Sequence, residues 1–200
     1  MIKLYDYLES GNGYKVRLLL TLLRQQFQRI ELDIVKGETR TPAFLSLNPN
    51  GRIPTVVLDD GRVLAESNAI IWYFAEGTRL LPEDRFARAE VLQWLCFEQY
   101  SHEPNIATVR FWVHLLALQD RAQQVAEKRK LGIAALGVME GRLNGRTYFV
   151  GERYSIADIA LYAYTHVAHE GGFDLAPYPA IRAWLARVAA EPGHIPITKG

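Results

Sequence analysis

A polar turn, "SGNG", separates a strand-like stretch from a helix-like one and holds the first residues that could do chemistry. Ser10 lies where the carboxyl end of a strand would meet a helix N-terminus. Such an end presents unpaired N–H groups and the positive end of the helix dipole, so it favours an anion. A serine hydroxyl adds one donor but needs an adjacent base to act as a nucleophile, and all five histidines lie beyond residue 100. We therefore expect Ser10 to stabilise a bound anion; the alternative is that Ser10 or Asn12 only caps the helix.

Two later stretches, "GRIPTVV" and "LAESNAI", could also contact a ligand. Pro54 opens a strand, and a cis Ile53–Pro54 bond would turn the backbone N–H and C=O of Ile53 outward, where an extended peptide could pair with them. The alternative is an ordinary trans bond. Ser67 is expected as a helix N-cap that could also hold a carboxylate, and Glu66 could accept from an ammonium group. This pair fits the head group of a free α-amino acid; the alternative is a plain cap.

The elements that position these residues form a β-α-β-α-β-β-α series. Residues 2–7 alternate apolar and polar side chains, which is typical of a half-buried strand, and apolar residues then recur at helical spacing. The pattern predicts strand 2–7, helix 14–25, strand 28–35, a helical turn at 43–47, a hairpin over 55–64 and a helix over 68–76 that Ser67 caps and Gly77 ends.

After about residue 82 the sequence has no strand signal of comparable quality, and helical patterns cover 80–101, 118–143, 155–170 and 178–193. Ser155 precedes Asp158 by three residues, which is a variant of the capping box. We therefore predict an α/β domain at 1–77, a linker at 78–84 and an all-helical domain at 85–200.

Composition narrows the range of partners. The formal net charge is +1, which gives no long-range attraction to nucleic acid or an anionic membrane, and 49% hydrophobic residues exclude a disordered chain. Cys96 is the single cysteine, so no intrachain disulfide or Cys-x-x-Cys motif exists. His166 and His169 lack an obvious third ligand, so no metal is predicted. With no targeting or membrane-spanning stretch evident, we expect a soluble, cytoplasmic protein.

Three motifs in order, "SGNGYKVRLLL", "LNPNGRIPTVVLDDGRVLAES" and "GERYSIADIALY", resemble the cytosolic glutathione S-transferase family over essentially the whole chain. Within that family the pattern is most similar to bacterial Ser-type members near the theta, zeta and nu-like groups. The resemblance implies a thioredoxin-like N-terminal domain that binds glutathione as co-substrate. It also implies a helical domain that supplies the electrophile site, and a homodimer. The implied reaction is transfer of the glutathione thiolate to small hydrophobic electrophiles, as in detoxification.

The resemblance also assigns roles to the N-terminal residues. Ser10 matches the hydroxyl that donates to the glutathione sulfur, although Asn12 could share or take over this role. Ile53, ahead of the family's cis proline at Pro54, matches the backbone pair on the cysteinyl moiety. The remaining matches are Glu66 and Ser67 for the γ-glutamyl head group, and more loosely Lys36 and Arg52 for the glycyl carboxylate.

In the helical domain the resemblance implies an electrophile site drawn from Tyr100, His102, Glu103, Phe111 and Trp112. Ser155 and Asp158 match the family's structural capping box. Neither Ser10 nor Gly13 is cysteine, which disfavours a mixed disulfide with a protein thiol. Two alternatives remain: a glutathione-dependent disulfide reductase, peroxidase or isomerase, and a non-catalytic glutathione-binding or scaffold protein.

Overall fold

In the computed structural model, which describes residues 1–200, the N-terminal unit is built on a four-stranded mixed sheet with the order β2-β1-β3-β4. β2 runs parallel to β1, whereas β3 is antiparallel to both β1 and β4. The strands are β1 (Ile2–Asp6), β2 (Phe27–Glu31), β3 (Thr55–Val57) and β4 (Val63–Ala65).

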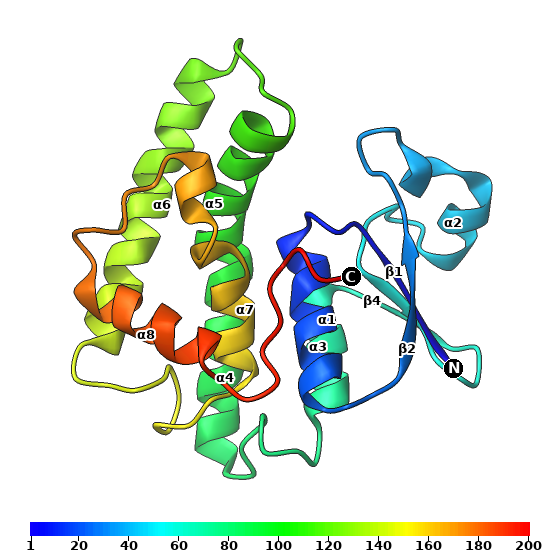
Figure 1. Ribbon diagram of the computed structural model, residues 1–200, viewed down its shortest axis with the longest axis horizontal. Helices are drawn as coiled ribbons and strands as arrows, with labels where there is room; N and C mark the ends of the chain where they lie inside the picture. Colours follow the sequence, from blue (N-terminus) through cyan, green and yellow to red (C-terminus); the bar gives the residue numbers. More distant parts are fainter. The chain divides into compact units, whose positions relative to one another are not determined.

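Helices cover the two faces of this sheet differently. α1 (Gly11–Leu22) and α3 (Ser67–Ala75) lie on one face, and α2 (Pro42–Leu47) lies on the other, after a short 3₁₀ turn at Glu38–Arg40 (Figure 1). The ring of Tyr5 packs against Phe44 of α2 with centroids 5.7 Å apart. The predicted β-α-β-α-β-β-α order is confirmed, and the unit has the thioredoxin-like arrangement.

Several predicted boundaries are wrong, and two of them lie in the first unit near β2 and α3. The strand predicted over 28–35 ends at Glu31, because the Asp33 carboxylate accepts from the N–H groups of Val35 at 2.9 Å and Lys36 at 3.1 Å and so stabilises a turn. At α3 the cap position is Glu66 instead of Ser67, and Ser67 is the first helical residue.

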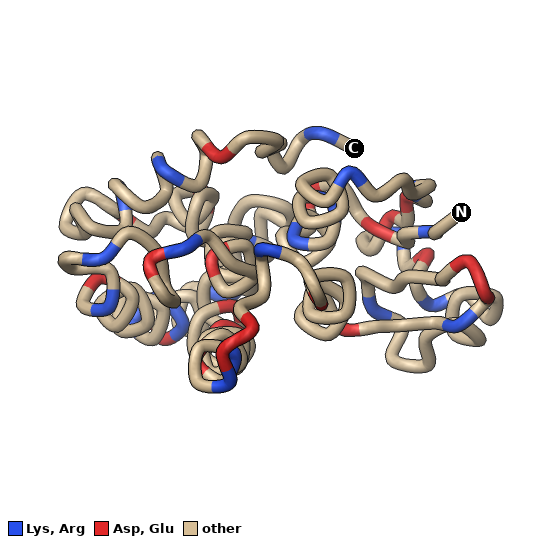
Figure 2. Tube along the Cα trace, turned by 90° about the horizontal axis from the view of Figure 1, so that it is seen from below, with Lys and Arg blue, Asp and Glu red and all other residues tan.

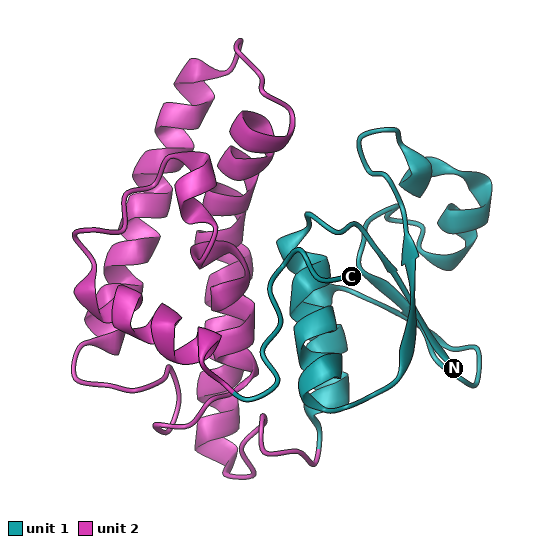
Figure 3. Ribbon diagram, in the orientation of Figure 1, with its two compact units in different colours: residues 1–76, 192–200 teal, residues 77–191 magenta.

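The second unit, residues 77–191, contains only helices and their connections (Figure 3). α7 is buried at every position and contacts α4, α5 and α8. The ring of Phe149 packs on Trp94 at 4.7 Å and on Trp184 at 5.2 Å, which anchors the core. The helices are α4 (Arg85–Phe97), α5 (Glu103–Arg110), α6 (Ala122–Leu143), α7 (Ile156–Thr165) and α8 (Pro179–Ala189), with a 3₁₀ turn at Ala168–Gly171.

Two π-helical segments, Glu98–His102 and Phe111–Leu115, flank α5. Pro104 has no N–H and cannot make the ordinary α-helical bond to a carbonyl four residues earlier. The N–H of Glu103 instead bonds to the carbonyl of Glu98. Such segments are uncommon within helices and frequently occur at functional sites.

Residues 192–200 are an exception to the predicted division. They belong to the first unit, although the sequence assigned them to the helical domain (Figure 3). The tail runs beside α1, to which it is hydrogen-bonded through the side chains of Tyr14 and Arg17 (Figure 1). The sequence contained no signal for this contact because the acceptors are backbone carbonyls.

Charged residues of both signs are interspersed along the chain, as Figure 2 shows. No helix combines the length and apolar character that crossing a bilayer requires. No three His, Cys, Asp or Glu side chains converge as metal ligands would.

Candidate functional site

Three separate stretches of the first unit meet at one end of its sheet. Because β3 is antiparallel to both neighbours, its start lies beside the ends of β1 and β4: Thr55 is the register partner of Tyr5 and of Ala65. The loop after β1, the Ile53–Pro54 bond and the β4–α3 junction therefore converge. The sequence predicted the three stretches, and the antiparallel register brings them together.

Ser10 holds the N-cap position of α1 and is nearly buried. Its Oγ accepts from the N–H of Gly13 at 3.3 Å, so the helix cap that the sequence left as an alternative is formed. An accepting hydroxyl still has its own proton to donate. Capping and donation to a ligand are therefore compatible roles for this side chain.

The N-terminus of α3 is tied to the first turns of α1. The Ser67 hydroxyl donates to Oδ1 of Asn12 at 3.4 Å. Nζ of Lys15 donates to Oγ of Ser67 at 3.3 Å and to Oδ1 of Asn68 at 3.4 Å, and Lys15 is fully buried. Two helix N-termini, each favouring an anion, are therefore joined by a polar network around Ser67.

Glu66 has an uncommon backbone conformation, with φ 66° and ψ 114°. Positive φ is costly for a residue with a Cβ and concentrates at ligand-binding sites. Glu66 is exposed next to the buried Ser67. Its exposure leaves the residue accessible to a ligand cation.

The Ile53–Pro54 bond is cis, which was one of the two alternatives that the sequence left open. The stretch before it is held by Asn48, whose Nδ2 donates to the Arg52 carbonyl at 2.8 Å and to Oγ1 of Thr55 at 3.1 Å. Asn48 is buried and supports this segment from within the unit.

The two predicted cationic residues have different surroundings. Lys36 is 76% exposed, and its Nζ forms an ion pair with Oδ2 of Asp33 at 3.0 Å. This ion pair raises the pKa of Lys36. Arg52 is exposed directly before Ile53, at the same end of the sheet as the three converging stretches.

The predicted electrophile-site residues lie on the continuous helical path of α4, α5 and the π segments, but their environments differ. Tyr100 is 87% exposed, whereas Phe111 and Trp112 are half-buried. His102 is fully buried, and its Nε2 lies 2.9 Å from Oγ1 of Thr165. This burial favours a structural role for His102. Glu103 opens α5 and is half-buried.

A buried ion pair lies beneath the turn that carries Ser10. Nε of Arg17 is 2.7 Å from Oδ2 of Asp6, and both side chains are fully buried. Burial raises the pKa of Asp6 to about 6, and the Arg17 guanidinium opposes this shift. A Cβ at Gly13 would overlap the Asp6 carboxylate, so glycine is required where α1 approaches this pair.

The predicted capping box at Ser155 and Asp158 is confirmed. Oδ2 of Asp158 accepts from the Ser155 N–H at 2.9 Å, and Oδ1 accepts from the Phe149 N–H at 3.1 Å and from Nε1 of Trp184 at 3.0 Å. Burial raises the pKa of Asp158 to about 6. This carboxylate joins three segments of the helical unit.

Sequence reasoning missed several polar residues that support the site. They share complete or near-complete burial in the first unit: Asp6, Lys15, Arg17 and Asn48. A signal existed for Lys15 and Arg17, since both interrupt the apolar series of the first predicted helix. A cation flanked by core positions indicates a buried partner.

Both units match the same known family. The family model "Glutathione S-transferase, N-terminal domain" matches residues 10–76, and "Glutathione S-transferase, C-terminal domain" matches residues 92–192. The chain belongs to the glutathione S-transferase family.

Individual relatives agree over nearly the full length. A solved structure of a glutathione S-transferase from Pseudomonas fluorescens superposes with a TM-score of 0.96 at 50% identity, covering 98% of each chain. The disulfide-bond oxidoreductase YfcG of Escherichia coli (strain K12) is 33% identical over 96% of this chain and 92% of its own. A maleylacetoacetate isomerase of Pseudomonas aeruginosa is 31% identical over 96% of this chain and 92% of its own. A glutathione-related function is therefore supported, and the names of the relatives cover three reactions.

Proposed function

We propose that the protein is a Ser-type glutathione transferase that binds glutathione as the thiolate and transfers it to small hydrophobic electrophiles. One observation carries the proposal: two helix N-termini, capped by Ser10 and begun by Ser67, lie at the same end of the sheet and are linked through Asn12. Two anionic groups of one ligand, a thiolate and a carboxylate, suit two such ends.

In the proposed mechanism Ser10 donates its hydroxyl proton to the glutathione sulfur. A free thiol titrates near pH 8.5, and the thiolate is the nucleophile. A hydrogen bond and the N-terminus of α1 both favour the charged form and lower the thiol pKa. The thiolate then attacks the electrophilic carbon, the new C–S bond forms and the leaving group departs with its electron pair.

The other proposed contacts orient the tripeptide. Ser67 holds the γ-glutamyl carboxylate and Glu66 its ammonium group, while the backbone of Ile53 pairs with the cysteinyl moiety. Lys36 and Arg52 lie near the glycyl carboxylate. Such fixed positioning converts a bimolecular encounter into an effectively unimolecular step.

The helical unit is proposed to supply the electrophile site. Phe111 and Trp112 are its best-placed apolar candidates, because both are half-buried and lie on a π-helical segment. The guanidinium of Arg121 lies 4.9 Å from the Trp112 ring centroid, which orients the indole. Tyr100 and Glu103 remain candidates for the same site.

Isothermal titration with glutathione and a thiol titration test this proposal. Wild-type protein should bind glutathione in the millimolar range or tighter and shift its thiol absorbance titration below pH 8.5. Ser10→Ala should raise the bound thiol pKa by about one to two units, because it removes a hydrogen bond to a charged group. Absence of binding at millimolar glutathione contradicts the proposal. If the bound thiol pKa rises in Asn12→Ala and not in Ser10→Ala, the sulfur contact is assigned to Asn12.

A second candidate is a glutathione-dependent disulfide reductase, which the 33% identity to a disulfide-bond oxidoreductase favours. The bound glutathione thiolate would attack a substrate disulfide and release one substrate thiol, and a second glutathione would resolve the mixed disulfide as oxidised glutathione. The chain's only cysteine, Cys96, is exposed on α4 and is not one of the residues that converge at the end of the sheet, so both thiols are proposed to come from glutathione.

A panel of three substrates separates the chemistries. A chlorinated nitroarene reports conjugation, a mixed disulfide reports reduction and an organic hydroperoxide reports peroxidase activity; maleylacetoacetate would test the isomerase alternative. Turnover of none of them despite glutathione binding would favour the non-catalytic binding or scaffold alternative.

We also propose a cytoplasmic homodimer. α4 exposes Phe86 by 74% and Leu92 by 51%, on the side away from the buried Trp94 and Leu95. A second copy would cover these side chains, since large exposed apolar side chains on one face are typical of interfaces. Light scattering should give twice the chain mass for wild type and one chain mass for Leu92→Glu.

A further inference from the structure

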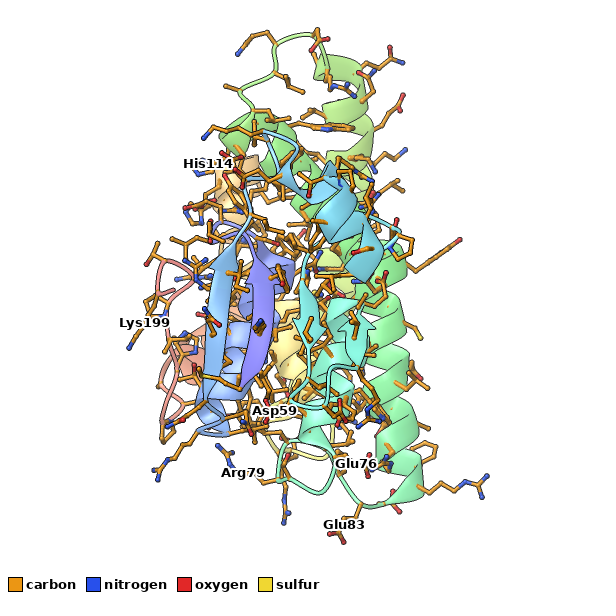
Figure 4. The ribbon with its side chains drawn as sticks, turned by 90° about the vertical axis from the view of Figure 1, so that its right-hand side faces the viewer. Asp59, Glu76, Arg79, Glu83, His114 and Lys199 are labelled. Carbon is orange, nitrogen blue, oxygen red and sulfur yellow. The ribbon has the colours of Figure 1, made fainter.

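Residues 194–199, here called the strap, are fastened to α1 mainly through their backbone carbonyls. The Tyr14 hydroxyl donates to the Ile195 carbonyl at 2.7 Å, and Nη1 of Arg17 donates to the carbonyls of Ile197, at 2.9 Å, and Lys199. The Ile195 and Ile197 side chains are buried. The Lys199 side chain points away from the chain into solvent (Figure 4), so its carbonyl, and not its ammonium group, makes the contact.

The same guanidinium holds the loop that leads to Ser10. Nη2 of Arg17 donates to the Leu8 carbonyl at 2.7 Å, and Nε pairs with Asp6 at 2.7 Å. Oδ1 of Asp6 accepts the Tyr7 N–H at 2.7 Å, and the Ser10 N–H bonds to the Tyr7 carbonyl at 2.8 Å. Arg17 is thus connected to Ser10 through a short series of hydrogen bonds.

Arg17 links the two segments physically. Its side chain is fully buried while the strap is in place, and the strap carbonyls are part of what covers it. If the strap leaves, Nη1 loses two carbonyl acceptors and becomes open to water, so the guanidinium is no longer held in one orientation. Its contact with Leu8 and the Asp6 carboxylate beneath Gly13 would then shift together, because Gly13 packs directly against Asp6.

We propose that Arg17 is a positioning residue through which the strap fixes the Ser10 loop and thereby sets the ionisation of the bound thiol. This inference rests on the proposed binding of glutathione. A hydrogen bond to sulfur depends on placing the donor to within about half an ångström. Ser67 is tied to Asn12 and Lys15 instead of Arg17, so its head-group contacts should change less than the contact to the sulfur.

The main test compares wild type with a chain that ends at Gly193 and with Tyr14→Phe, which removes the hydroxyl contacts to the Ile195 carbonyl and to Nε2 of His194. Removing the strap should raise the bound thiol pKa by about one unit, which is about tenfold less thiolate at a pH well below that pKa. Tyr14→Phe should give a smaller shift in the same direction. Affinity for S-methylglutathione, which has no ionisable thiol, should change less than twofold.

Controls make the outcome specific. Thr198→Ala removes an exposed strap side chain and keeps the backbone, so its thiol pKa should equal that of wild type. Arg17→Lys keeps a charge beside Asp6 but cannot reach Leu8 and the strap together, so it should also raise the bound thiol pKa. It provides the test where the shortened chain does not fold. An unchanged thiol pKa in the shortened chain and in Arg17→Lys overturns the inference. An equal loss of affinity for glutathione and S-methylglutathione also overturns it.

Amide hydrogen exchange without ligand separates this inference from the proposed function. The amides of Tyr7, Leu8 and Ser10 should exchange at least several-fold faster in the shortened chain, with no comparable change in β3. Unchanged exchange refutes the coupling itself. If wild type does not bind glutathione but these amides respond, the proposed function fails and the coupling stands.

Discussion

Each unit contains one buried carboxylate behind a helix N-terminus, and the two have different partners. Asp6 lies beneath the first turn of α1 and pairs with Arg17, while Asp158 lies in the first turn of α7 and accepts only from neutral donors. Burial raises the pKa of each to about 6. The partners of Asp158 are its own helix and two core segments, so it serves folding. The partners of Asp6 connect it to the Ser10 loop and the strap, so this buried carboxylate serves to position the loop.

The largest loss of unfolding free energy is expected from Asp158→Ala. The change leaves the Ser155 and Phe149 N–H groups and the Trp184 indole without their acceptor in the core. Unfolding free energy should fall by about 3–5 kcal/mol, measured by urea denaturation. Asp84→Ala, which removes an exposed cap of α4, should cost only about 1 kcal/mol. Similar losses in the two variants would contradict the role given to Asp158.

Asp6→Asn should have a smaller effect on stability and a larger one on function. The asparagine keeps an acceptor for Tyr7, but Arg17 loses its counter-ion while retaining carbonyl acceptors at Leu8 and the strap. We expect a loss of about 2–3 kcal/mol in unfolding free energy. The bound thiol pKa should also rise. A thiol titration identical to that of wild type would contradict the difference in role between Asp6 and Asp158.

The two carboxylates also predict a pH dependence of stability. Their folded pKa of about 6 lies above the reference value of 3.8, so the folded protein binds more protons between these values. Their stabilising contribution is therefore full below pH 3.8 and is lost as pH rises through 6. Compared with wild type, Asp6→Asn and Asp158→Asn should each show a smaller decline in unfolding free energy from pH 4.5 to 7. A steeper decline in either variant would reverse the assigned direction of the shift.

The smallest effects separate the two N-cap serines. Ser10→Ala and Ser155→Ala should each cost about 1 kcal/mol of stability, since each removes a helix cap. Only Ser10→Ala should raise the bound thiol pKa. Equal thiol titrations in the two variants would remove the functional distinction between the caps.

Local patterns predicted most elements because they depend on neighbours in the chain. The Ser155–Asp158 capping box lies within one helical turn, and Pro179 begins α8 as expected from its fixed φ. The strand predicted over 28–35 was too long because the hydrogen bonds from Val35 and Lys36 to Asp33 compete with the alternating apolar pattern. Residue propensities alone do not show whether the continued strand or the turn at Asp33 is more stable.

By itself, the sequence determined the order of the N-terminal elements, the presence of an α/β part followed by a helical part, and the three stretches around Ser10, Pro54 and Ser67 that we propose contact the ligand. Each depends on residues close together in the chain. Only the tertiary structure decided that Lys15 contacts Ser67, that Arg17 pairs with Asp6, and that residues 194–199 lie on α1. These contacts join residues up to 182 positions apart, and the strap atoms that accept from Arg17 are backbone carbonyl oxygens. Every residue has such a carbonyl, so no side-chain pattern specifies which one Arg17 will reach.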